Sequence, residues 1–100
     1  MLRTSVEELM DLSALPGGEL IRQGLGDLAE GRESDAALLV LIGAPRLRRL
    51  GLELPTQSTP GAEHRLYHLL ARSDPDSAHS RYNALLRRLV RFERAAECAV

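Results

Sequence analysis

Residues 34–43 read Ser-Asp-Ala-Ala-Leu-Leu-Val-Leu-Ile-Gly and contain the longest unbroken apolar run of the chain. A helix that is apolar on all sides is buried on all sides, so this stretch predicts a central helix over Asp35–Ile42. Ser34 is a suitable N-cap for that helix, and Gly43 ends it. A buried strand is the alternative, but only two residues of the run are β-branched and no partner strand is visible elsewhere, which favours the helix.

Helical spacing and turn residues extend the helical pattern in both directions. Thr59 before Pro60, and Asp74 before Pro75, each place a capping residue ahead of a proline at the first helical position. The predicted helices are a short one that ends at Leu12 after a capping box at Thr4 or Ser5, then Glu19–Glu30, Arg46–Leu50, Pro60–Ala71 and Pro75–Glu97. With the central helix they predict an all-α fold in one domain over residues 1–100, a compact bundle of five to six helices with a long C-terminal amphipathic helix.

Two glycines lie inside the predicted helix over Glu19–Glu30. Gly24 falls within the apolar stripe of this helix, which predicts the close approach of another helix. Gly26 lies on the outer face and only weakens the helix. The same periodicity places Asp27 outside the apolar face.

The composition excludes several classes of protein. Three aromatic residues and few β-branched ones argue against a β-sandwich or barrel. The longest apolar run, Ala36 to Ile42, is far shorter than the roughly 18 to 20 residues that a membrane helix needs. Cys98 is the only cysteine, so no intramolecular disulfide can form. The first dozen residues lack the uncharged stretch of a secretory signal, so we expect a cytoplasmic protein.

The net charge of −1 hides an uneven distribution. Residues 1–44 carry eight acids and three arginines, a balance of −5, whereas residues 45–100 carry six acids and ten arginines, a balance of +4. All thirteen basic residues are Arg, whose guanidinium group suits bidentate contact with carboxylates and phosphates. We expect the two parts of the chain to attract each other.

The most organised polar feature lies on the last predicted helix. Helical spacing puts five arginines in one arc opposite the apolar stripe and places Glu93 outside that arc. With no acid among them, these side chains repel one another unless something negative approaches. Their complement is a nucleic-acid backbone, an acidic helix of a partner or the acidic first half of the chain, and a merely solvated face is the structural alternative. The five are Arg81, Arg87, Arg88, Arg91 and Arg94, and Arg46, Arg48 and Arg49 extend the basic surface only if folding brings them near.

A helix-turn-helix would fit only between Asp35 and Leu52, where an apolar helix, a glycine and an arginine-rich segment follow one another. The turn would place the bulky Leu39 where a small residue is usual and Arg49 at a buried position. The second helix is also only about two turns long. These features argue against a helix-turn-helix.

His64 and His68 stand four residues apart on one predicted helical face, the spacing that lets two imidazoles share a metal ion. No third ligand is fixed on that face, and His79 or Cys98 would have to arrive from the next helix. We therefore expect no metal and no other cofactor.

Arg72 and His79 are separated by six residues and lie near a predicted helix junction. This pair resembles the Arg-x4-6-His signature of HEPN-type ribonucleases, small helical proteins that are often found in toxin–antitoxin pairs. The resemblance covers these two residues, and Ser73 stands where many members carry a polar amide or an acid. It implies metal-independent RNA cleavage by a dimer, with Arg72 and His79 in the cleft.

The sequence thus predicts a small non-enzymatic binding or regulatory protein, antitoxin-like or an accessory subunit, that acts by protein–protein association. Leucine-rich helices and the arginine face are the expected contact elements. Nucleic-acid binding through the same face is one alternative, and a HEPN-like ribonuclease is another. Protein association predicts an exposed apolar patch beside the arginines, whereas nucleic-acid binding predicts a steep dependence on salt. A homodimer is left open, and no membrane partner is expected.

Overall fold

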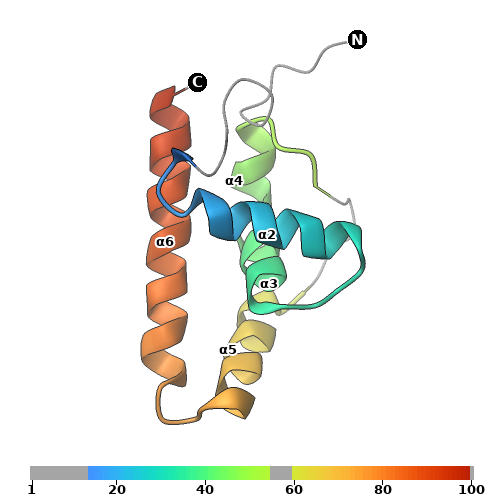
Figure 1. Cartoon of the computed structure of the whole chain (residues 1–100), viewed down its shortest axis with the longest axis vertical. Helices are drawn as coiled ribbons and strands as arrows, with labels where there is room; N and C mark the ends of the chain where they lie inside the picture. Colours follow the sequence, from blue (N-terminus) through green and yellow to red (C-terminus); the bar gives the residue numbers. More distant parts are fainter. Residues whose placement is uncertain (1–13, 55–59, 100) are drawn as a thin grey trace.

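The computed structural model describes residues 14–54 and 60–99, and this part of the chain forms helices and connecting turns without strands (Figure 1). The helices are α2 (Gly18–Ala29), α3 (Asp35–Ile42), α4 (Ala44–Arg49), α5 (Ala62–Ser73) and α6 (Ala78–Ala99). The prediction of an all-α fold with a long C-terminal helix is confirmed. The helix predicted to end at Leu12 and the capping role of Thr59 lie outside the described residues.

Helix α3 is the centre of the fold, as its apolar sequence predicts. Residues 36–40 are all buried, and α3 packs against α2, α4, α5 and α6. Figure 1 shows α2 crossing α3, while α6 runs the length of the molecule beside the other helices. The Ser34 hydroxyl accepts a hydrogen bond from the Ala37 N–H at 3.1 Å. The predicted N-cap, the predicted bounds and the helical state of this stretch are therefore confirmed.

Gly24 allows α2 to approach α3 closely. A Cβ at this position would stand 2.5 Å from Val40 Cγ2 and nearer still to the Ala36 carbonyl oxygen. A Cβ at Gly26 would meet nothing within 4 Å. The close approach predicted at Gly24 and the outer position predicted for Gly26 are confirmed, and a side chain at Gly24 would collide with the α3 backbone at the crossing of the two helices.

Asp27 is buried, although the periodicity of α2 placed it outside the apolar face. Its carboxylate accepts a hydrogen bond from the Ser34 hydroxyl at 2.6 Å and lies 3.2 Å from the Arg32 guanidinium. Its carbonyl oxygen accepts a hydrogen bond from the Arg32 N–H at 2.8 Å. The prediction was wrong because the turn between α2 and α3 folds back over Asp27, and the periodicity of one helix cannot show a turn that covers it.

Helices α5 and α6 begin later than their capping signals predict. Pro60 lies in a turn and Gly61 has a left-handed φ of 76°, so α5 begins only at Ala62. After Asp74 the next three residues also form a turn, in which the Asp76 N–H donates to the Asp74 carboxylate at 3.2 Å. A capping residue followed by proline is common both in turns and in the first turn of a helix. This signal therefore predicts that a helix is near but does not identify its first residue.

The apolar stripe of α6 packs into the core as predicted. Ala78, Leu85, Leu89, Phe92 and Ala96 are buried. Tyr82, the other residue that helical spacing assigns to this stripe, is half-buried. Its ring makes an edge-to-face contact with Tyr67 of α5, with ring centres 5.5 Å apart. In the described part of the chain, no helix combines the length and the apolar character that crossing a membrane requires.

Candidate binding surface

The five arginines selected from the sequence are all exposed on α6. They are Arg81, Arg87, Arg88, Arg91 and Arg94. Within residues 14–54 and 60–99, no carboxylate lies within ion-pair distance of any of them. The described structure therefore leaves these positive charges on α6 without acidic partners.

The structure divides these arginines between two sides of α6. Arg81 and Arg88 do not line the pocket that the other three arginines share. The Arg88 carbonyl oxygen faces the start of α2, where it would lie 2.8 Å from a Cβ at Gly17. The remaining three lie along a shallow pocket of about 380 Å³ on the exposed side of α6, which we call the α6 groove. The described residues that line the α6 groove are Asn83, Leu86, Arg87, Val90, Arg91 and Arg94.

Two apolar side chains occupy the middle of the α6 groove. Val90 is 38% exposed, which is high for a large apolar side chain, and Leu86 is half-buried. They stand four residues apart, so they lie on the same face of the helix. Their spacing could have been found in the sequence as a second, narrower apolar strip between the buried stripe and the arginines. An exposed apolar strip rimmed by charge is typical of interaction sites.

A second pocket lies on the other side of Leu86 and Val90, between α6 and the junction of α3 and α4. It has a volume of about 360 Å³, and we call it the Glu93 pocket. Its lining residues are Ile42, Gly43, Pro45, Arg46, Arg49, Leu86, Leu89, Val90 and Glu93. Folding thus brings Arg46 and Arg49 to the apolar strip on the side opposite Arg87, whereas Arg48 does not line this pocket.

The burial of Glu93 was not predicted by helical spacing. Its side chain is only 6% exposed, whereas helical spacing predicted only that Glu93 lies outside the arginine arc. Arg46 Nη1 lies 3.6 Å from Glu93 Oε1, whereas Arg46 Nη2 and Nε lie 2.8 and 3.0 Å from Glu97 Oε2. Burial raises the pKa of Glu93, Glu97 raises it further, and Arg46 and Arg49 oppose the rise.

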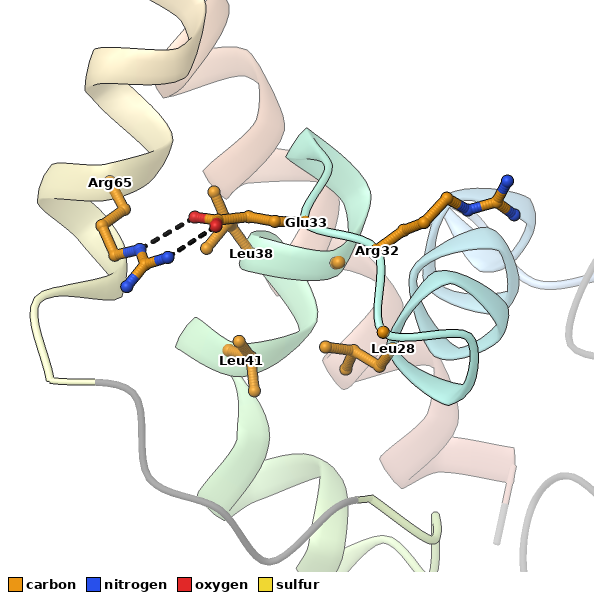
Figure 2. A pocket seen from close by; sticks show the side chains of 8 residues that line it. Leu28, Arg32, Glu33, Leu38, Leu41 and Arg65 are labelled. Atoms are coloured by element: carbon orange, nitrogen blue, oxygen red, sulfur yellow. Dashed lines mark hydrogen bonds and ion pairs between the residues drawn. The ribbon is translucent and has the colours of Figure 1, made fainter.

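A third pocket, of about 210 Å³, lies between the α2–α3 turn and α5 (Figure 2). Leu28 and Leu41 face each other across it, and Arg32 points away from it toward α2. Glu33 reaches across to α5, where Arg65 Nε and Nη2 donate to its two carboxylate oxygens at 2.8 and 2.5 Å. These hydrogen bonds lower the pKa of Glu33. The pair joins the acidic first part of the chain to the basic second part, as the charge distribution predicts, and it covers the core at this edge.

The three histidines lie apart from the α6 groove. His64 and His68 are exposed on α5, on the side away from its buried residues, as predicted. His79 lies in the first turn of α6, with its Nε2 3.2 Å from Asn83 Nδ2. Among the described residues, no group of three or more His, Cys, Asp or Glu is placed to hold a metal ion.

The pair that resembles the ribonuclease signature flanks the turn between α5 and α6. Arg72 lies in the last turn of α5 and His79 in the first turn of α6, and both are exposed. Asp74 and the three residues after it separate the two helices. The pair therefore lies on an accessible edge, and its activity on RNA stays a prediction.

The segment that was compared with a helix-turn-helix folds differently from such a motif. Gly43 alone separates α3 from α4, and α4 has six residues. Leu39 is buried and Arg49 is exposed, which agrees with the sequence argument against this motif.

Comparison of the chain with protein-family models, with curated proteins and with solved structures finds no match. The geometry and charge of the α6 groove are therefore the basis for a functional assignment.

Proposed function

We propose that this protein is a small binding protein that takes up an acidic amphipathic helix of a partner protein along the α6 groove. The observation that carries the proposal is the apolar strip of the exposed Val90 and the half-buried Leu86, which lies between two sets of arginines. Arg87, Arg91 and Arg94 line the strip on one side, and the guanidinium groups of α4 approach it on the other.

Each part of this surface has a separate role in such a complex. Burial of the apolar strip supplies affinity, because Val90 and Leu86 lose contact with water on docking. The arginines orient the partner and speed its approach, since a guanidinium group binds a carboxylate in a bidentate manner. Together they favour a ligand with apolar residues on one face and acidic residues on both flanks of that face.

The shape of the surface favours a helix as the docked element. The α6 groove extends over residues 83–94 of one straight helix, a length of about 17 Å at 1.5 Å per residue. A partner helix of about three turns matches this length and presents apolar side chains at positions i, i+3, i+4 and i+7. Recognition of this kind is typical of amphipathic helices that lie in apolar grooves.

Nucleic-acid binding is the second candidate, because five exposed arginines lack a described acidic partner. A phosphate backbone would neutralise these arginines largely without regard to Leu86 and Val90. The two functions therefore make different demands on the same helix. Protein association needs the apolar strip and the arginines beside it, whereas nucleic-acid binding needs positive charge anywhere on the face.

The test is fluorescence anisotropy with labelled probes and four forms of the full chain. The probes are an acidic helical peptide of about four turns with leucine at i, i+3, i+4 and i+7, the same peptide with its residues scrambled, duplex DNA and single-stranded RNA. The forms are the wild type, Val90→Ser, Arg87→Gln with Arg91→Gln, and a matched control, Arg81→Gln with Arg88→Gln. The control removes the same charge from the same helix at two exposed positions outside the α6 groove.

We expect the patterned peptide to bind more tightly than the scrambled one. Val90→Ser and the Arg87/Arg91 variant should each weaken binding by about tenfold, whereas the Arg81/Arg88 variant should stay within about twofold of the wild type. Equal binding of the two peptides, or equal loss in both arginine variants, would overturn the proposal. A log–log salt slope of about −4.5 for duplex DNA, or of about −3.5 for single-stranded RNA, corresponds to about 0.9 or 0.7 for each of five arginines and would assign the surface to nucleic acid instead.

A competing acidic segment within the chain is tested in the same assay. Glu7, Glu8 and Asp11 belong to the acidic first part of the sequence and lie outside the described residues. Their joint replacement by Gln and Asn should leave peptide affinity unchanged if the partner is a separate protein. A gain of tenfold or more would identify the chain's own acids as the occupant, and light scattering reports whether a second copy supplies them.

The ribonuclease resemblance is tested by incubating labelled RNA with the purified wild type and with His79→Ala. Cleavage by the wild type that is lost in the variant would support the resemblance, provided both proteins have the same thermal midpoint. RNA that stays intact in both samples would remove it.

A further inference from the structure

Among residues 14–54 and 60–99, no group donates a hydrogen bond to the Glu93 carboxylate. A buried carboxylate ordinarily accepts several hydrogen bonds, because burial without them costs free energy. The nearest described cation, Arg46, is 3.6 Å away through Nη1, which is too long for a hydrogen bond. The guanidinium group of Arg46 makes its short contacts with Glu97 instead.

The carboxylate also stands in the wall of an open pocket. Glu93 lines the Glu93 pocket together with the apolar side chains of Ile42, Leu89 and Val90. Gly43 makes room for it, because a Cβ there would lie 3.0 Å from Glu93 Oε2 and 2.9 Å from Leu89 Cδ1. The φ of Gly43 is −88°, which any residue can adopt, so the glycine is needed here for space rather than for its backbone conformation.

The groups around the pocket limit the chemical classes of ligand that it can bind. Arg46 and Arg49 stand at its rim and repel a cation, while Glu93 itself repels an anion. The apolar walls favour an apolar body. A neutral hydrogen-bond donor carried on an apolar ring satisfies all three conditions, and a volume of about 360 Å³ holds one such side chain rather than a large ligand.

We propose that Glu93 is a specificity-determining residue that accepts a hydrogen bond from an aromatic side chain with an N–H or O–H donor, an indole above all, on the segment that docks along α6. The indole N–H is a donor only, and a carboxylate is an acceptor only, so the two are complementary. This inference rests on the proposed function, since Leu86 and Val90 line both the α6 groove and the Glu93 pocket. A helix that covers the strip can therefore place one side chain in the pocket.

The first experiment uses small probes and the full chain. Amide shifts in NMR spectra are followed while indole or 1-methylindole is added to the wild type, Glu93→Gln and Glu93→Met. We expect indole to shift the amides of Ile42, Leu89 and Val90, and 1-methylindole, which lacks the donor, to bind about tenfold more weakly. Glu93→Gln keeps a carbonyl acceptor and should keep this preference, whereas Glu93→Met should bind both probes equally.

The second experiment repeats the peptide assay with one leucine of the patterned peptide replaced by Trp. The chain has no Trp, so a blue shift of the peptide's emission reports burial without background from the protein. We expect the Trp peptide to bind about tenfold more tightly than the leucine peptide to the wild type but not to Glu93→Met. Thermal midpoints of both Glu93 variants establish that they are folded.

The outcomes separate this inference from the proposed function. Equal binding of indole and 1-methylindole to the wild type, or no shift near the pocket, would overturn the role of Glu93. If the patterned peptide binds but Trp adds nothing, the groove function stands and the inference fails. If indole is preferred and no patterned peptide binds, the pocket binds hydrogen-bond donors through Glu93 and the proposed partner is wrong.

Discussion

The Ser34 hydroxyl has two functions, since it accepts the Ala37 N–H and donates to the Asp27 carboxylate. Ser34→Ala removes the N-cap of α3 and leaves Asp27 buried with one hydrogen bond fewer. We expect a loss of stability of about 2 kcal/mol, more than for an ordinary cap. Chemical denaturation measures it, with Ser80→Ala as control, because the exposed Ser80 hydroxyl donates a single hydrogen bond, to the Ser77 carbonyl oxygen in the turn before α6. Equal losses in the two variants would contradict the double role of Ser34.

Glu93 should make stability depend on pH. Burial raises the pKa of its folded-state carboxyl above 4.5, so the folded protein holds this proton more tightly than the unfolded chain does. The stabilisation is complete below pH 4.5 and is lost as the pH rises through the raised pKa. The free energy of unfolding of Glu93→Gln minus that of the wild type is therefore expected to grow over this pH range. A difference that shrinks would mean that Arg46 holds Glu93 in a favourable ion pair.

The burial of Asp27 and of Glu93 could not be predicted from the sequence, for the same reason in both cases. Each lies at the border of an apolar stripe, where helical spacing leaves the choice between core and solvent open. In both cases a segment outside the helix determines whether the residue is buried. The α2–α3 turn covers Asp27, and the α3–α4 junction at Gly43 covers Glu93. Borderline polar residues therefore need the tertiary fold before they can be assigned.

At the level of elements, helices with a strong apolar pattern were predictable from the sequence, whereas the exact residues at which helices begin were not. The apolar run of α3 predicts a buried element, and its few β-branched residues and the N-cap at Ser34 favour a helix over a buried strand. The stripe of α6 is similarly clear over 22 residues. The start of α5 was mispredicted because Gly61 takes a left-handed conformation, a choice that its sequence neighbours do not reveal. For the binding surface, periodicity predicts the arginines. The spacing of Leu86 and Val90 is equally visible in the sequence, but only the fold shows that Val90 is exposed.

The two glycines of α2 provide a matched test of how α2 and α3 pack. Gly24→Ala places a methyl group against Val40 and the Ala36 backbone, so we expect a loss of about 1–3 kcal/mol. Gly26→Ala adds a methyl group to open space in the same helix and should gain about 0.5–1 kcal/mol. Thermal unfolding compares both with the wild type. A Gly24→Ala protein as stable as the wild type would mean that the two helices separate without cost.

Across the described structure, five exposed arginines of α6 lack an acidic partner, while Arg65 and Arg46 are paired with carboxylates. Glu33 binds Arg65, and Glu97 binds Arg46, but Arg87 and Arg91 face solvent in the described structure. These two arginines stand four residues apart on one helix, where like charges cost a few tenths of a kcal/mol. A surface that lowers the stability of the free protein is expected where a partner later supplies the opposite charge.

Removal of these two arginines is therefore expected to raise the stability of the free protein and to weaken its binding of the peptide. Arg87→Gln with Arg91→Gln should stabilise the free protein by about 0.5 kcal/mol at low salt, because it removes the repulsion between close arginines while Gln keeps a similar helix propensity. The same variant should lose peptide binding. Salt should raise the unfolding midpoint of the wild type more than that of the variant, since salt screens repulsion only where it exists. Arg81→Gln with Arg88→Gln, whose two positions are seven residues apart, should change stability less.

A loss of stability in the Arg87/Arg91 variant, instead of the expected gain, would identify an acidic partner within the chain. If the Arg87/Arg91 variant is less stable than the wild type, and salt weakens the wild type, the two arginines are engaged by carboxylates of the chain itself. The acids available for that role include Glu7, Glu8 and Asp11, so their replacement should then cost the same stability. Because a surface already paired with its own chain must release that pairing before it takes a partner, affinity for the acidic peptide should rise in the variant that lacks these acids.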